Sequence, residues 1–223
     1  MKKTTTILCL GIALCMLGCS DDDDQVTTTS TVPFSLTASL SPRSSDAEDT
    51  GILQGNWDAN SQLAVIKTGS SGVPKSILTR KTDSSDTFTG NLSTLVKNEN
   101  EIAVFYPAAA ITANSSDTLT QTLNLSGQDG TLAGITNYDY LWAQCKAGMN
   151  ETTGSSACEM TSLVTIGKFQ FTVNGGSPLN NITRITITAT AGTLYSSAVM
   201  KLKNGEFSST QTGNITIKNK TCL

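Results

Sequence analysis

The stretch "VPFSLTASLS", residues 32–41, has an apolar side chain at every second position, with Pro33 and then serine or threonine between them. Because successive side chains of a strand point to opposite faces, this period of two predicts a β-strand with one buried face. Pro33 near its beginning suits the start of a strand or the edge of a sheet. The apolar side of the predicted strand consists of Val32, Phe34, Leu36, Ala38 and Leu40.

Further strands are predicted at short intervals along the chain, separated by turn signals such as "TGSSG", "NGG" and "KNGE". Threonine is abundant, and β-branched side chains fit a pleated, half-buried surface. Many short strands without a convincing helix predict an all-β fold, an antiparallel β-sandwich with Greek-key connections. The further predicted strands are 62–67, 76–81, 87–92, 102–106, 119–125, 138–143, 163–173, 182–189, 195–202 and 214–218.

Residues 1–18 have the pattern of a secretory signal, two lysines followed by an apolar core too short to span a bilayer. The triplet ending at Cys19, Leu-Gly-Cys, resembles the bacterial lipobox, in which the cysteine is acylated and becomes the new N-terminus. An ordinary signal peptide followed by an incidental cysteine is the alternative. We therefore predict lipidation of Cys19, which would anchor the mature chain to a membrane.

Residues 19–31 are predicted to form a solvated tether, because the adjacent aspartates 21–24 repel one another. The full chain carries 15 basic and 18 acidic residues, so removing the two lysines of the signal leaves 13 basic residues and a net charge of −5. Phosphate binding needs a basic face, so this balance argues against nucleic acid as a partner.

Three cysteines follow the predicted lipidation site. Cys145 and Cys158 flank the polar segment "KAGMNETTGSSA", which can loop back on itself. Export to an oxidising compartment then favours a disulfide between the two. Cys222 is left over, either as a free thiol or as a cross-link to another chain.

The sequence offers little for catalysis. It contains no histidine, which removes or weakens the usual triads and zinc sites, and it contains neither GxSxG nor a phosphate-binding loop. We predict that the chain is not an enzyme and that it has no catalytic residues, no metal and no cofactor. A glycosidase pair could come only from scattered carboxylates that are more typical of solvated loops: Glu99, Glu101, Asp117 and Asp139.

One aromatic stripe allows two interpretations. Tyr138, Tyr140 and Trp142 share one face of the predicted strand 138–143. Such rings usually fill a core, with their polar atoms reaching a partner at its margin. Alternatively they form an exposed platform for sugars, as Trp57 could also do. The alternative function is therefore a surface glycan-binding lipoprotein for nutrient capture.

Four segments together resemble the N-terminal domain of the Bacteroidetes fimbrillin-like proteins. They are "GNWDANSQLAVIK" at 55–67, "EIAVFYPAAA" at 101–110, "LNLSGQDGTLAGITNYDYLWA" at 123–143 and "NITRITITATAGTLY" at 181–195. The resemblance implies a transthyretin-like β-sandwich over residues 32–223 and a lipoprotein of the type V fimbrial system. The acidic residues after Cys19 resemble the signal that exports such lipoproteins to the outer face of the outer membrane.

The resemblance also implies an assembly mechanism. In polymerising members a protease cuts after an arginine beyond the first strand, and a strand donated by another subunit fills the groove that opens. Arg43 matches that position, although an ordinary surface arginine is the alternative. Polymerising members have a second domain that supplies the donor strand, which this chain does not match. We therefore expect a structural, accessory or anchoring fimbrial subunit with a role in adhesion, or else an inert monomeric lipoprotein.

Overall fold

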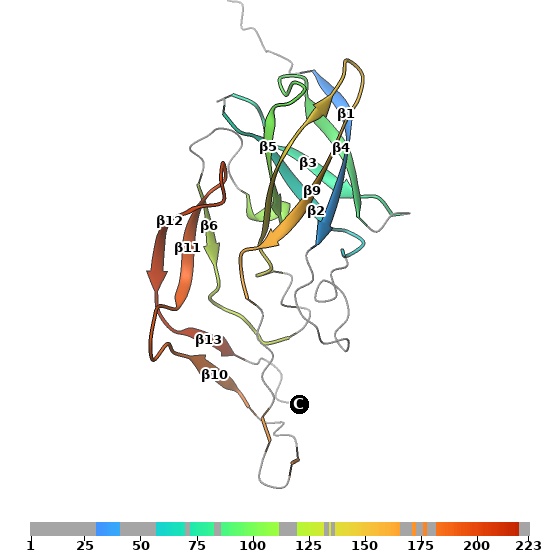
Figure 1. Ribbon diagram of the computed structural model, residues 1–223. Helices are drawn as coiled ribbons and strands as arrows, with labels where there is room; N and C mark the ends of the chain where they lie inside the picture. The colour runs from blue at the N-terminus through green and yellow to red at the C-terminus, as the bar shows by residue number, and fades with distance from the viewer. Residues whose placement is uncertain are drawn as a thin grey trace, which may run out of the picture.

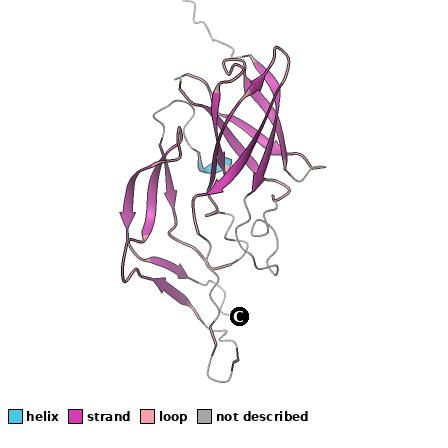
Figure 2. Ribbon diagram, viewed as in Figure 1, coloured by secondary structure: helices cyan, strands magenta, loops and turns pink. Residues whose placement is uncertain are grey.

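The computed structural model describes residues 30–40, 57–69, 72–82, 86–111, 120–131, 134, 137–165, 171–172, 176–177 and 182–218. Its described elements are almost entirely β-strands, so the predicted all-β class is confirmed (Figure 2). The predicted sites at Cys19, Arg43 and Cys222 lie outside the described residues.

The strands follow one another closely along the chain, and a short 3-10 turn, η2 (Ala108–Ala110), follows the fifth of them. Their bounds are β1 (Thr31–Leu40), β2 (Gln62–Lys67), β3 (Ser76–Arg80), β4 (Thr87–Ser93), β5 (Glu101–Tyr106), β6 (Thr120–Asn124), β7 (Leu141–Lys146), β8 (Gly148–Met149), β9 (Gly154–Ser162), β10 (Arg184–Ile187), β11 (Tyr195–Lys201), β12 (Phe207–Thr212) and β13 (Ile215–Lys218).

Seven of these strands close into a barrel-like sheet rather than the predicted sandwich (Figure 1). Their order is β1-β4-β3-β2-β5-β7-β9, and β1 then pairs with β9. All of these pairings are antiparallel except the last, in which β1 runs parallel to β9. A sandwich needs two separate sheets with free edges, whereas β1 pairs on both of its sides, so these seven strands form a closed ring. The short β8 adds to the same sheet by pairing with β9.

The barrel interior holds the larger of two apolar cores. It contains the inward side chains of β1 together with residues such as Leu63 of β2, Leu78 of β3 and Phe88 of β4, all of them fully buried. The burial of β1 alternates residue by residue, as the sequence pattern predicts. A strand with one face in a core and one face towards solvent shows this alternation.

A second core lies on the outer surface of the barrel. Ala64 and Ile66 of β2 and Phe105 of β5 point outward and pack with Leu123 of β6 and Met200 of β11. The last two residues belong to the three-stranded sheet β12-β11-β6, which lies beside the barrel in Figure 1. Because β2 and β5 are covered on both faces, they are buried almost continuously.

Strands β10 and β13 form a separate two-stranded antiparallel sheet. It lies beyond the end of the three-stranded sheet and away from the barrel (Figure 1). Its residues are exposed or half-buried, and neither apolar core includes them.

Several predicted strands differ from those observed. The strand predicted at 182–189 is limited to β10, residues 184–187, and strands β8 and β12 were not predicted. The strand predicted at 138–143 begins instead at Leu141. The strand predicted at 163–173 is absent at 163–165, and most of its remaining residues lie outside the described part. The chain places β9 just before it, in the stretch "GSSACEMTS" that begins inside the predicted polar loop.

Candidate functional site

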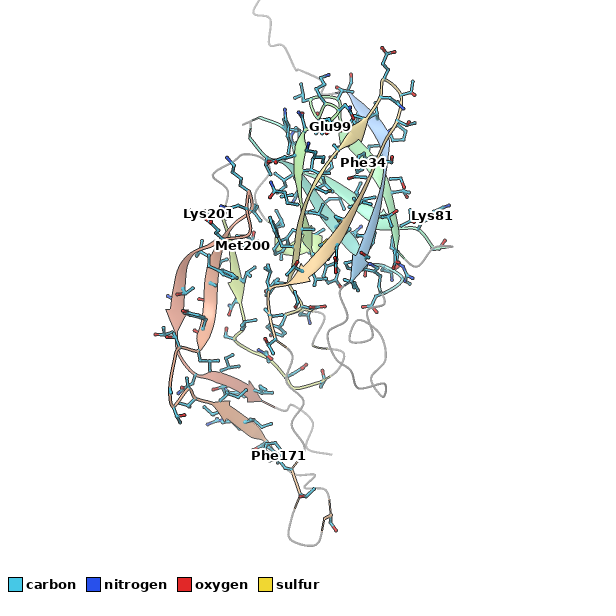
Figure 3. All side chains as sticks on the ribbon, viewed as in Figure 1. Phe34, Lys81, Glu99, Phe171, Met200 and Lys201 are labelled. Carbon is cyan, nitrogen blue, oxygen red and sulfur yellow. The ribbon has the colours of Figure 1, made fainter. Side chains whose placement is uncertain are left out.

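The candidate site is the seat of β1, by which we mean the groove between β4 and β9 that β1 fills. Residues Thr31–Thr37 pair with β4, and residues Phe34–Leu40 pair with β9. Phe34, Leu36 and Ala38 enter the barrel core, with exposed fractions of 2%, 0% and 0%. The predicted one-sided strand is therefore a wall of the barrel, and its apolar side completes the core (Figure 3 labels Phe34).

One end of the seat is held by Trp57, the first described residue after the segment 41–56. Its indole Nε1 donates a hydrogen bond of 2.7 Å to the main-chain oxygen of Ala38. The ring packs edge-on against Phe88 and Tyr106, at centroid distances of 5.0 and 5.3 Å. The guanidinium of Arg80 donates to the main-chain oxygen of Trp57. The chain that leaves β1 therefore returns to the same end of the barrel.

The other end of the seat opens to solvent. A cavity of about 300 Å³ lies there, beside Val32 at the beginning of β1. Val96 and Met149 also line it, together with polar residues of the neighbouring turns. The two ends of β1 thus differ, because one is closed by an indole ring and the other faces a cavity.

Cys145 of β7 and Cys158 of β9 lie beside the seat, and both are half-buried free thiols. Leu141 of β7 pairs with Ser162 of β9, and Gly148 of β8 pairs with Ser155 of β9, in one continuous register. Between these two pairs, the same register places Cys145 opposite Cys158. Both side chains pack against the barrel core. The predicted loop between them is therefore a hairpin, and the disulfide stays a prediction.

The two thiols influence each other's ionisation. The hydrogen bond from Cys158 lowers the pKa of Cys145 to about 7, and a weaker one from the Ser156 hydroxyl, at 3.3 Å, acts in the same direction against the effect of burial. The pKa of Cys158 is raised, first by its hydrogen bond to Cys145, and then by burial and by the nearby negative charge. Cys145 is therefore the thiol of the pair that ionises first.

The aromatic residues of the alternative site are distributed between core and margin. Tyr140 is buried with an exposed fraction of 7%, and burial raises the pKa of its hydroxyl. Trp142 is half-buried against the second core, and its Nε1 donates to the main-chain oxygen of Leu202 at 3.1 Å. Tyr138 is half-buried, whereas Trp57 is buried in the barrel. Burial of Trp57 and Tyr140 favours the core interpretation over a sugar platform.

The carboxylates considered for catalysis have other contacts. Glu99 forms a surface ion pair with Lys146 at 3.1 Å, and Glu101 accepts a hydrogen bond from Gln144. Asp139 is fully buried, and Asp117 lies outside the described residues. Across the part of the chain that the structure describes, no group of three or more acidic, histidine or cysteine side chains could hold a metal ion. The expectation of no enzymatic activity stays a prediction.

The sequence analysis missed three residues that shape the seat. Trp57 was considered only as a possible sugar platform, although it closes one end of the barrel. Gly90 and Gly154, on the strands that flank β1, were not singled out. Glycine inside a strand is a signal for close backbone approach, and this signal could have found Gly90 in the predicted strand 87–92 but not Gly154, which lies in a predicted loop.

Comparisons with known proteins give one structural neighbour. No protein-family model matches the sequence, and no curated protein sequence matches it. The crystal structure of a "putative cell adhesion protein" from Bacteroides ovatus ATCC 8483 is similar, with a TM-score of 0.52 and 14% sequence identity. The match covers 87% of this chain and 75% of that one. It supports a common fold.

The described residues contain no helix with the length and apolar character needed to cross a membrane.

Proposed function

We propose that this chain is a lipid-anchored protein of the bacterial outer surface that acts as a fimbrial structural, accessory or anchoring subunit in adhesion. It associates with other subunits by exchange of β1 for a donated strand. The single observation that carries this proposal is the position of β1, which is paired on both sides and supplies core residues from the beginning of the described chain.

Strand exchange suits this geometry for a physical reason. An incoming strand restores both ladders of main-chain hydrogen bonds and refills the core, so it replaces what β1 provides. Without a replacement, the barrel would expose the edges of β4 and β9 together with an apolar groove. Loss of each large side chain from the core would cost about 1.5–3 kcal/mol.

The connection between β1 and the rest of the barrel supports the same proposal. Segment 41–56 joins Leu40 to Trp57 and contains Arg43, the proposed processing site. Arg80, by comparison, lies in β3 and donates to a main-chain oxygen, and it is a poorer substrate for a protease. A cut after Arg43 would leave β1 attached only by non-covalent contacts.

The structural neighbour adds support of a general kind. Its description as a putative cell adhesion protein is consistent with a surface role. The fimbrial part of the proposal is supported by the sequence resemblance to fimbrillin-like proteins. A lipid anchor at Cys19 belongs to this proposal.

The proposal is tested by cutting the purified chain after Arg43 with a trypsin-like protease. Residues 19–43 are then separated in denaturant and the remainder is refolded with a labelled peptide of residues 31–40. We expect a stable one-to-one complex, and oligomers when the peptide is left out. An Arg43→Gln variant, treated in the same way, should keep its own β1 and bind no peptide. A refolded product that stays monomeric and refuses the peptide would overturn the proposal.

A further inference from the structure

The seat of β1 has an unusual shape around Phe34. In the two ladders, Phe34 lies opposite Gly90 of β4 and opposite Gly154 of β9. Both neighbours of this aromatic residue therefore lack a side chain. An aromatic ring packed over strand glycines covers backbone that would otherwise be poorly packed.

The space above each glycine is already filled. A Cβ atom built on Gly154 would lie 2.7 Å from Cδ2 of Phe34 and would overlap the thioether sulfur of Met149. A Cβ atom on Gly90 would lie 2.6 Å from the main-chain oxygen of Ile77 and 2.9 Å from Cδ2 of Leu78. The missing side chain of Gly90 therefore makes room for β3, whereas that of Gly154 makes room for Met149 and the Phe34 ring. The groove under β1 thus has one position, at Phe34, where a glycine of β9 leaves space for an aromatic ring.

The opposite end of the groove is narrow. Ala38 is fully buried, lies opposite Cys158, and accepts the hydrogen bond of Trp57 on its main-chain oxygen. A larger side chain would have to displace its neighbours, because interiors are packed without spare volume. Leu36, between the two positions, is fully buried and lies opposite Phe88. The groove therefore fits the pattern aromatic–x–aliphatic–x–small.

A second segment of the chain carries the same pattern. Residues 169–175, "FQFTVNG", place Phe171, Val173 and Gly175 at the positions of Phe34, Leu36 and Ala38. The C-terminal stretch "NITIKNKTCL" alternates as well, but it has no aromatic residue. Phe171 is 40% exposed, and its side chain belongs to neither apolar core (Figure 3).

We propose that the donor strand is residues 169–175 of a second copy of this chain, with the ring of Phe171 in the place of Phe34. This inference rests on the proposed function, and it names both the partner and the contact that selects it. The segment lies in the connection between β9 and β10, which spans residues 163–183. Donation in this way would link copies of the chain head to tail.

The first test uses peptides on the cut and refolded acceptor described above. Four are compared: residues 31–40, residues 168–176, residues 168–176 with Phe171→Ala, and residues 214–222. We expect the first two to bind, and Phe171→Ala to weaken binding about tenfold or more, since a buried ring is lost. A 168–176 peptide with Thr172→Ala, which alters the outward side, should bind like its parent.

The outcomes separate the two proposals. If the 31–40 peptide binds and the 168–176 peptide does not, this inference is wrong and strand exchange stands. If neither binds, strand exchange itself is wrong. If the Phe171→Ala peptide binds as tightly as its parent, or the 214–222 peptide binds as well, selection by the aromatic position is wrong.

The second test uses the whole protein. Phe171→Ser is expected to leave the intact chain folded and to abolish the oligomers formed after cutting, as measured by light scattering. The matched control is Phe207→Ser, because Phe207 lies on β12 and is exposed to a similar extent, 47%. Oligomers that survive Phe171→Ser, or that disappear equally in both variants, would overturn the inference.

Discussion

Trp57 and Ala38 are joined by a hydrogen bond of 2.7 Å from the indole Nε1 to the main-chain oxygen, although segment 41–56 separates them along the chain. The bond is buried, so the oxygen of Ala38 has no access to water as a substitute partner. Trp57 therefore fixes both the end of β1 and the point at which the chain re-enters the barrel. Several consequences can be measured.

Trp57→Phe should destabilise the protein by about 1–3 kcal/mol, because it leaves a buried oxygen unsatisfied while keeping an aromatic ring against Phe88. Urea unfolding followed by circular dichroism measures the change. Trp142→Phe is the matched control, since its Nε1 also donates to a main-chain oxygen but its ring is only half-buried. A loss for Trp57→Phe no larger than that for the control would contradict the anchoring role.

Leu36→Ala should lower the free energy of unfolding by about 2–5 kcal/mol, because Leu36 is fully buried in the barrel core. Thr37→Ala, at the next residue on the solvent face, should change it by about 0.5 kcal/mol or less. Equilibrium urea denaturation compares the two. Similar effects of both substitutions would mean that β1 does not complete the core.

Cys145 should react with iodoacetamide faster than an ordinary thiol at neutral pH. Its pKa of about 7 means that the thiolate forms as the pH rises through 7. The reaction rate, followed by mass spectrometry of the labelled peptide, should be half-maximal near that pH. Cys158→Ala removes the first cause of the lowered pKa and should move this midpoint to higher pH. An unchanged midpoint would contradict the coupling of the two thiols.

Oxidation should join Cys145 and Cys158, because they face each other on neighbouring antiparallel strands. Exchange with oxidised glutathione forms the Sγ–Sγ bond and releases two molecules of reduced glutathione. Closing a loop of this length should stabilise the protein by about 3 kcal/mol. Peptide mapping and thermal unfolding check the bond and its effect, and a Cys145→Ser variant should show neither. A bridge from either residue to Cys222 instead would contradict the prediction.

Tyr140→Ala should destabilise the second core by about 3 kcal/mol or more, since the ring is buried against Phe105. Tyr138→Ala, at a half-buried position, should cost less. Thermal unfolding and binding to a glycan array are measured together. A Tyr140→Ala protein that stays fully stable but loses sugar binding would favour the glycan alternative.

Much of the fold follows from local pattern. The alternation in residues 32–40 predicts β1 almost to the residue, because one face of that strand meets a core and the other meets solvent. Strand β2 is also predicted with its observed bounds, although both its faces are buried. A short apolar run that contains β-branched residues and lies between turn signals is sufficient to predict this strand.

Strand β9 is missed for a reason that lies elsewhere in the chain. Its inward residues begin with Gly154 and Ser156, which read as loop residues in isolation. Gly154 has no room for a side chain because the thioether of Met149 and the ring of Phe34 occupy the space above it. This strand is therefore specified partly by a contact with a distant segment of the chain, and a pattern read over a few neighbouring residues does not contain that contact.

Barrel closure could not be predicted for a similar reason. The number and length of strands suit a sandwich as well as a barrel. The difference depends on whether β1 finds a second partner, and that partner was the missed strand β9. Of the candidate sites, the cysteine pair could be predicted from its spacing in the sequence. The wide and narrow positions of the groove could not, because they depend on how side chains from different strands pack.

The parallel pairing of β1 with β9 also governs how the protein is made. Residues in contact across this seam, such as Ser39 and Cys158, are separated by 119 positions along the chain. The strand that is synthesised first must therefore stay unpaired on this side until a much later strand has been synthesised. Such distant contacts slow folding, so the final step is expected to be the docking of β1 onto an otherwise assembled wall. Until then the nascent molecule presents the same open groove that the proposed donor strand would fill.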